Sequence, residues 1–146
     1  MRITYKGDYA LKALLDLTLH YDQGLSTIHD IAKRINAPVK FLEQVLLELK
    51  GAGFVESRRG KVGGYLLAKT PGQITLGEVV RLIDGPIEPI ACVEKGYTGC
   101  TDVYKCVFRP IWSDVGKAIA EVVDNITFEK LASKIQVNRE TVAYQI

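Results

Sequence analysis

The first half of the chain carries apolar side chains at helical spacing in three consecutive segments. They run from about residue 8 to 21, from 28 to 35 and from 39 to 50. Ser26 or Thr27 can cap the second segment, and Asn36-Ala37-Pro38 forms a turn before the third. The positions expected to face inward are Leu11, Leu14, Leu15, Thr18, Ile28, Ile31, Ala32, Ile35, Phe41, Val45, Leu46 and Leu49. The pattern predicts a helix-turn-helix whose second helix begins near Val39.

The residues after the third helix predict a short β-hairpin with a basic, glycine-rich tip. Gly51 and Gly53 end the helix, and the strand-like segments 54–55 and 65–67 flank the tip. Three cations lie in this tip with no acid among them: Arg58, Arg59 and Lys61. By itself such a cluster indicates a solvated turn. After a helix-turn-helix it indicates a wing whose cations meet DNA phosphates or the minor groove.

The start of the third helix is the expected site of base recognition. In a winged helix-turn-helix this helix enters the major groove, where Gln can pair with adenine and Glu can accept from cytosine. The exposed polar positions expected there are Lys40, Glu43 and Gln44.

The second half of the chain predicts one capped helix, a long aperiodic loop and a long helix. Thr75-Leu76-Gly77-Glu78 has the capping-box pattern for a helix that ends at Gly85-Pro86. Residues 87–107 lack periodicity, and a loop of this length is usually functional or disordered. Pro110 opens a helix to about Asn125. Thr127 then caps a last short helix, and the tail from residue 135 is expected to be frayed or partner-dependent.

The long helix has two interpretations, packing onto its own domain or forming a dimer seam. Its apolar positions follow one another at steps of four, four, three and four, close to coiled-coil spacing. They are Ile111, Val115, Ile119, Val122 and Ile126. A two-fold dimer fits a DNA-binding protein, because paired recognition helices match palindromic half-sites one helical turn apart.

Composition and charge narrow the function classes. The 146 residues carry a formal net charge of +2, so nucleic-acid binding has to be argued from where the charge lies. The sequence has no run of 18 apolar residues and no signal-peptide pattern, and we expect a cytoplasmic protein without a membrane partner. Neither histidine has a nucleophile partner by motif and no Walker-type loop is present, so we do not expect an enzyme.

All three cysteines fall in the aperiodic loop, with the spacing C-x7-C-x5-C. They are Cys92, Cys100 and Cys106. Soft thiolates select Zn, Cu(I) or iron–sulfur clusters, and three ligands leave a fourth position open. The alternative is three unrelated reduced cysteines, which behave as small buried hydrophobes. Their confinement to the one segment without an apolar pattern favours a ligand cluster.

Together these stretches resemble the Rrf-two family of winged-helix transcription regulators, which includes IscR, NsrR, RirA and CymR. The resemblance covers about residues 1 to 134. It is carried by MRITYKGDYALKALLDL, FLEQVLLELKGAGFV, SRRGKVGGYLLAK, ITLGEVVRLIDGP, the cysteine loop and NITFEKLA. Cysteine-free members are known, so the trio implies the branch that carries a cluster. The resemblance implies a homodimer that crosses its long helices and holds a 2Fe–2S or 4Fe–4S cluster on the three cysteines.

The fourth ligand is where the sequence departs from part of this family. The IscR branch typically has C-x5-C-x5-C and a ligand His three residues on, where this chain has Arg109. The only histidines, His20 and His29, lie in the first two predicted helices. In NsrR-like members an Asp from the other subunit can be the fourth ligand, and Asp8 stands at the matching position. Its other interpretation is an N-terminal helix cap.

The resulting prediction is a mostly α fold with a small β-hairpin wing, a winged helix-turn-helix followed by a long dimerisation helix. The expected parts are a DNA-binding domain over 1–84, a cluster-binding loop over 85–109, the dimerisation helix and a short helix over 110–134, and a tail over 135–146.

The expected function is a DNA-binding transcription regulator, a repressor, acting as a homodimer on double-stranded DNA with a palindromic operator. Its iron–sulfur cluster would sense iron–sulfur status, redox state or nitric oxide. Two alternatives remain: a cluster-free winged-helix regulator that responds to thiol oxidation or a small molecule, and a zinc-binding interaction adaptor.

Overall fold

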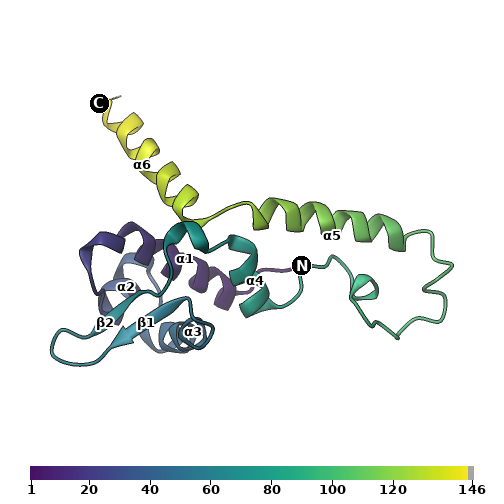
Figure 1. The fold of residues 1–146 in the computed structure, drawn as a ribbon, viewed down its shortest axis with the longest axis horizontal. Helices are drawn as coiled ribbons and strands as arrows, with labels where there is room; N and C mark the ends of the chain where they lie inside the picture. The colour runs from purple at the N-terminus through teal and green to yellow at the C-terminus, as the bar shows by residue number, and fades with distance from the viewer. Residues whose placement is uncertain (145–146) are drawn as a thin grey trace.

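Helices α1 to α4 and a small sheet gather at one end of the molecule, and α5 and α6 extend away from them (Figure 1). The computed structural model describes residues 1–144, which contain six α-helices and one two-stranded antiparallel sheet. The elements are α1 Tyr5–Leu19, α2 Ile28–Ile35, α3 Val39–Gly51, β1 Val55–Arg58, β2 Gly64–Leu67, α4 Leu76–Asp84, α5 Arg109–Asp124 and α6 Phe128–Tyr144, with 3-10 turns at Tyr21–Gln23, Pro71–Gln73 and Ala91–Val93. The predicted fold class is confirmed. No helix within residues 1–144 combines the length and apolar character needed to cross a membrane.

The first helix begins earlier than predicted, because Thr4 and not Asp8 caps it. The Thr4 hydroxyl oxygen accepts a hydrogen bond from Gly7 N at 3.1 Å, which satisfies a donor of the first turn. The interpretation of Asp8 as the cap is therefore wrong. α1 ends at Leu19 rather than Tyr21, and its neighbours α2, α3, α4 and α6 pack around it.

The helix-turn-helix forms as predicted. The Thr27 side chain accepts from Asp30 N at 3.2 Å, and Asn36 takes the left-handed backbone conformation (φ 53°) that ends α2. Within the core, Leu14, Ile31, Val45, Leu46 and Leu49 are fully buried. Leu42, which the pattern did not single out, is also fully buried, whereas Phe41 is half-buried and packs edge-to-face on Tyr9 with 5.5 Å between ring centroids.

The end of the chain differs most from the prediction. α6 runs for 17 residues to Tyr144, so residues 135–144 of the predicted tail are helical instead of frayed. Residues 145–146 of that tail lie outside the described residues. Its start returns to the winged unit: Phe128 is 1% exposed within the core, and Phe128 N donates to Ile74 O at 3.1 Å. Leu76 N in turn donates to Ile126 O at 2.8 Å. The first turn of α6 therefore completes the core of a unit that the sequence ended at residue 84.

Candidate DNA interface and cysteine loop

Helix α3 buries one face and exposes a polar one. Leu42, Val45 and Leu49 point into the core, so the predicted reading positions lie on the opposite side of the helix. All three of these positions are exposed: Lys40, Glu43 and Gln44. In the described structure none of the three forms an ion pair or hydrogen bond with another side chain, which leaves their polar atoms available to a ligand.

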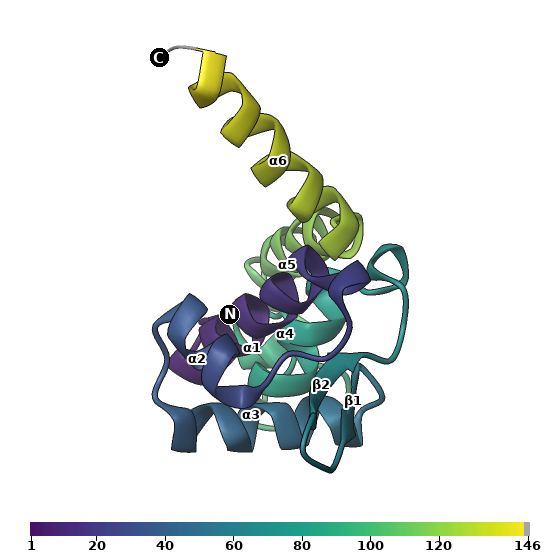
Figure 2. The ribbon, with the colours of Figure 1, turned by 90° about the vertical axis from the view of Figure 1, so that its left-hand side faces the viewer.

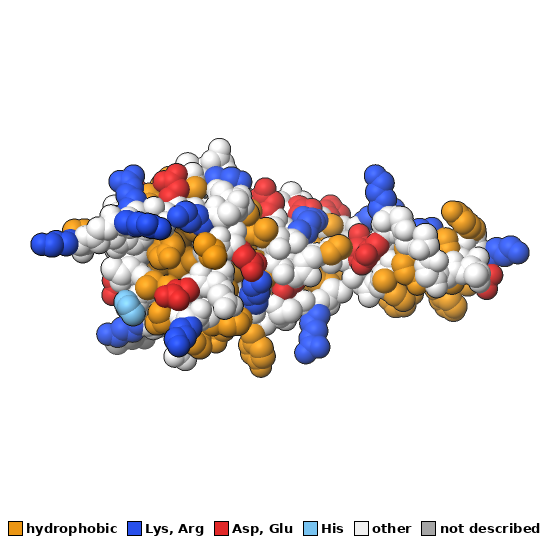
Figure 3. All heavy atoms as spheres, turned by 90° about the horizontal axis from the view of Figure 1, so that it is seen from below, with side chains coloured by type: hydrophobic (Ala, Val, Ile, Leu, Met, Phe, Trp, Pro, Cys, Tyr) orange, Lys and Arg blue, Asp and Glu red, His pale blue; other side chains and the backbone are white. Residues whose placement is uncertain are grey.

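The wing lies beside α3 on the same side of the molecule (Figures 1 and 2). Strand β1 pairs with β2 from Val55↔Leu67 to Arg58↔Gly64. The predicted cations are all exposed, Arg58 at the end of β1 and Arg59 and Lys61 in the connecting loop. Basic side chains surround the end of the molecule that carries this loop (Figure 3). Lys50 Nζ donates to Ser57 Oγ at 2.6 Å and joins the end of α3 to β1.

Two glycines of the wing are required by close backbone approaches. A Cβ on Gly63 would lie 2.7 Å from Arg58 O, and one on Gly64 would lie 2.6 Å from Ser26 O. Both contacts are with main-chain atoms, which cannot turn aside as a side chain can. Glycine at these positions lets the wing fold back on itself and lets β2 approach the segment before α2.

The cysteine loop occupies residues 85–108, between α4 and α5. Cys92 and Cys106 are half-buried, Cys100 is exposed, and all three are free thiols. Within residues 1–144 no group of three or more His, Cys, Asp or Glu side chains is arranged to hold a metal ion. The predicted convergence of the three thiols is therefore absent from this arrangement of the loop, and gathering them at one centre requires the loop to close. Chemically the donor set fits an iron–sulfur cluster, because reduced cysteine thiolates are its ordinary ligands.

Two of the cysteines lie at the start of α5. Arg109 Nε donates to Cys92 O at 2.9 Å, across 17 positions of the sequence. Cys106 and Arg109 line one cavity of about 290 Å³ together with Val93 and Tyr104. Arg109, three residues after Cys106, thus anchors the backbone of Cys92, the first cysteine.

Asp8 lies in the first turn of α1 and pairs with Lys12, with 2.6 Å between Oδ2 and Nζ. The hydrogen bond from Lys12 to this carboxylate raises the pKa of Lys12 above its ordinary value. Asp8 also lines an open groove of about 680 Å³ with residues 2–5 of the N-terminal segment. The groove gives another molecule access to the carboxylate.

The N-terminal segment is tied to the start of the cysteine loop. The Asp84 carboxylate accepts from Thr4 Oγ1 and from Thr4 N, the latter at 3.1 Å. The Met1 ammonium donates to Glu88 O at 2.8 Å. These contacts were not expected from the sequence, because they join residues at least 80 positions apart.

Helix α5 lies against α4 at one end and leaves much of its apolar surface uncovered. Ile111 is 58% and Val122 60% exposed, Val115 and Trp112 are exposed as well, and Ile119 is half-buried. Ile126 was predicted to continue this stripe, and that is wrong, since α5 ends at Asp124 and Ile126 lies in the link to α6. Contiguous exposed apolar side chains on one helix indicate a protein-binding surface.

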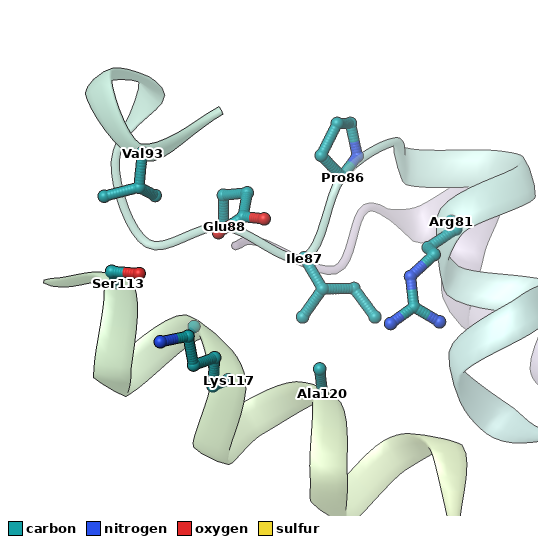
Figure 4. A pocket seen from close by; sticks show the side chains of 9 residues that line it. Arg81, Pro86, Ile87, Glu88, Val93, Ser113, Lys117 and Ala120 are labelled. Atoms are coloured by element: carbon teal, nitrogen blue, oxygen red, sulfur yellow. The ribbon is translucent and has the colours of Figure 1, made fainter. Parts of the chain in front are cut away.

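An ion pair closes the junction between α4 and α5. Arg81 donates to both carboxylate oxygens of Asp124, at 2.6 and 2.9 Å, and this hydrogen bonding lowers the pKa of Asp124. Beside it lies a cavity of about 480 Å³, bounded by α4, the first part of the cysteine loop and α5 (Figure 4). Glu88 and Lys117 face it from opposite sides (Figure 4).

An exposed polar helix after a tight turn, followed by a basic hairpin packed beside it, defines a winged helix-turn-helix DNA-binding protein. The chain belongs to the Rrf2 (Rrf-two) family, whose model, described as an iron-dependent transcriptional regulator, matches residues 3–134. The protein is therefore a DNA-binding transcription regulator.

Known proteins similar to this chain carry the names of such regulators. The HTH-type transcriptional regulator IscR of Cronobacter sakazakii is 37% identical over 137 residues, which are 94% of this chain and 83% of that protein. The structure of CymR, the global cysteine regulator of B. subtilis, superposes with a TM-score of 0.76 at 33% identity, covering 92% of this chain and 98% of that chain. The T. potens IscR structure gives 0.72 at 31% identity, covering 92% and 88%.

Proposed function

We propose that this regulator is a homodimeric repressor that senses iron–sulfur status, redox state or nitric oxide through a cluster on Cys92, Cys100 and Cys106. The observation that carries the proposal is the confinement of three free thiols to the single loop between the DNA-binding unit and α5. The family description as iron-dependent supports it. When bound, the cluster supplies iron–thiolate bonds that oxidants, nitric oxide or iron loss can break.

The loop is fixed at both ends to elements that can transmit a change in its shape. At its start, Asp84 holds the first turn of α1, and α1 packs against α3. At its end, Cys106 lies three residues before Arg109, the first residue of α5. Drawing three thiolates together therefore acts on α1 and on α5 simultaneously. Such a switch requires contacts that differ between the closed and open loop, which these two anchors supply.

Asp8 is the proposed fourth ligand, supplied to the cluster of the partner subunit. Its carboxylate lines the open groove of the N-terminal segment and pairs with Lys12 in a contact that both side chains leave half-exposed. Exchanging this surface ion pair for a metal bond costs little, because exposed pairs contribute about 0–1 kcal/mol. Ligation through α1 would couple the cluster directly to the helix that supports α3.

A second copy of the chain is the proposed partner of α5. The apolar side chains that α5 leaves exposed form a stripe that two helices can share: Ile111, Val115, Ile119 and Val122. A two-fold pair presents two α3 helices and two wings, which suits a palindromic operator. In each copy the proposed base-reading side chains are Lys40, Glu43 and Gln44, and the proposed phosphate or minor-groove contacts are Arg58, Arg59 and Lys61.

The experiment that tests the cluster is anaerobic purification with iron and sulfide counting and a visible absorption spectrum. We expect the spectrum of a thiolate-bound cluster from the wild type and none from a Cys92→Ala, Cys100→Ala, Cys106→Ala variant. Both proteins are then titrated against one operator. We expect their affinities to differ by a coupling of about 1–3 kcal/mol. Iron-free wild-type protein, or equal operator affinities, would refute the proposal.

A second candidate is favoured by the separation of the three thiols in this structure. A cluster-free regulator could respond to oxidation of the same cysteines, of which Cys100 is the most accessible. In that case oxidant alters operator affinity in metal-free wild-type protein and leaves the triple variant unchanged. Family membership favours both of these regulators over the interaction adaptor.

A further inference from the structure

Strand β2 of the wing is hydrogen-bonded on both of its edges. On one side β2 pairs with β1, and on the other the main chain of Ser26 pairs with Tyr65: Ser26 N donates to Tyr65 O at 2.9 Å, and Tyr65 N donates to Ser26 O at 2.8 Å. A two-stranded hairpin is marginally stable by itself, and here each strand has only four residues. The direction of the wing therefore depends on where Ser26 is held.

Ser26 is held by Arg34, which is also bound to a buried carboxylate. Arg34 Nε donates to Asp16 Oδ1 and Nη2 donates to Asp16 Oδ2, both at 2.8 Å, and Nη2 also donates to Ser26 Oγ at 3.0 Å. The Asp16 side chain is only 7% exposed, so α1 provides a rigid anchor for this contact. The planar guanidinium fork matches a carboxylate with two bonds, and a lysine ammonium cannot reproduce that geometry.

The approach of the wing to Ser26 is close enough to exclude a side chain. A Cβ on Gly64 would lie 2.6 Å from Ser26 O and 2.9 Å from its carbonyl carbon. The Cβ of Leu25 lies next, at 3.3 Å, so the main chain of Ser26 makes the closest approach and requires glycine at position 64. Together the contacts form a continuous chain from α1 through α2 to β2.

We propose that Arg34 is a positioning residue for DNA binding, which fixes the wing at its angle to α3 without touching DNA. This inference rests on the proposed contact between the wing cations and DNA. Two of its three polar nitrogens, Nε and Nη2, are used inside the protein, so its role is to hold Ser26 rather than a phosphate. Weakening the hydrogen bond between Arg34 and Ser26 should let the wing change its angle to α3, while the fold and the exposed surface of α3 stay the same.

The test is a double-mutant cycle on operator affinity and its salt dependence. Arg34→Lys and Ser26→Ala are each made in the wild type and in a wing-neutral background, Arg58→Ala, Arg59→Ala, Lys61→Ala. Arg34→Lys keeps the charge opposite Asp16, and Ser26→Ala removes only the hydroxyl that Arg34 reaches. Arg81→Lys is the matched control, because it makes the same substitution in another bidentate pair with an aspartate, far from the wing.

We expect Arg34→Lys and Ser26→Ala each to weaken operator binding by about threefold or more in the wild type and to have little effect in the wing-neutral background. The salt slope should fall toward that of the wing-neutral protein, because phosphate contacts are lost. Arg81→Lys should leave both quantities unchanged. Thermal unfolding of each variant verifies that the fold is intact. If Arg34→Lys does not fold, the result for Ser26→Ala tests the proposal.

Three outcomes would overturn the inference. An equal loss in both backgrounds would mean that Arg34 acts through general stability or contacts DNA itself. Unchanged operator affinity and salt slope in Arg34→Lys and Ser26→Ala would mean that the hydrogen bond between Arg34 and Ser26 does not position the wing. If the wing-neutral protein binds the operator as tightly as the wild type, the proposed contact between the wing cations and DNA is refuted. That result is distinguishable from a failure of the Arg34 proposal, because it is obtained without any change at Arg34.

Discussion

The carboxylate of Asp84, at the end of α4, accepts hydrogen bonds from both the main-chain N–H and the hydroxyl of Thr4, the N-cap of α1. The two residues are 80 positions apart, and the contact places a negative charge at a helix N-terminus, where it is stabilising. Because the cysteine loop begins at the next residue, the same contact fixes where that loop leaves the DNA-binding unit.

Gly7 leaves room for this contact, and its substitution should reveal it. A Cβ on Gly7 would lie 2.1 Å from Asp84 Oδ2, so Gly7→Ala must push the carboxylate away from Thr4. In an ordinary helix Gly→Ala stabilises by about 1 kcal/mol, but here the lost capping bonds should outweigh that gain. Thermal or urea unfolding should show Gly7→Ala destabilising the wild type and stabilising an Asp84→Ala background. The same sign in both backgrounds would contradict the contact.

The wing should contribute sequence-independent affinity. Arg59→Ala should weaken operator binding by about 1–3 kcal/mol if the arginine reads a base or a narrow minor groove, and should mainly lower the salt slope if it meets phosphate. Titration at several salt concentrations separates the two results. Arg139→Ala on the exposed part of α6 is a control that removes the same charge away from the wing. Unchanged affinity and slope in Arg59→Ala would exclude the wing from the interface.

Glu43 should restrict which sequences are bound. An exposed carboxylate on a DNA-facing helix repels phosphate unless a cytosine amino group donates to it. Glu43→Ala should therefore relax sequence preference while preserving overall binding, as measured by selection from a pool of randomised operators. Glu140→Ala, on α6, should leave the preference unchanged. A uniform loss of binding to all sequences would refute base reading by Glu43.

Asp8 should govern the lifetime of the cluster if it is a ligand. Asp8→Ala should shorten the survival of the anaerobic spectrum in air and shift its absorption, because one bond to iron is lost. Lys12→Ala is the matched control, since it breaks the same ion pair and keeps the carboxylate. An unchanged spectrum and lifetime in Asp8→Ala would leave that residue only its pairing with Lys12.

The Arg81–Asp124 pair should make a small, pH-dependent contribution to stability. Hydrogen bonding to Arg81 lowers the pKa of Asp124 below its ordinary value of 3.8, so the contribution is present above that value and is lost as the pH falls through the folded-state pKa. Both side chains are about 40% exposed, and solvent screening limits the pair to about 0.2–1 kcal/mol. Urea unfolding should show Asp124→Asn less stable than the wild type at pH 7 and equal to it in strong acid. A gap that persists in acid would mean that the loss is not electrostatic.

Local signals in the sequence were sufficient to predict the order and type of most helices and strands. Thr27 and the Thr75–Glu78 capping box act within one turn of their helices, and the structure contains both. The helix-turn-helix, the wing between β1 and β2 and the start of α5 near Pro110 follow from patterns of this range. Such signals are readable because capping and periodicity involve residues three or four positions apart.

The tertiary structure alone decided which distant residues meet. Asp84 binds Thr4, the N-cap of α1, and Arg34 joins Asp16 to Ser26, which pairs with the wing. Phe128 lies 44 positions after Asp84, the last residue of α4, and it fills the core of the winged unit. The extended α6 and the open arrangement of Cys92, Cys100 and Cys106 likewise depend on packing, or its absence, around each segment. The sequence shows which side chains can form each kind of contact, but many different pairs of residues could form the same kind of hydrogen bond or apolar contact. Only the burial of a common core selects among them.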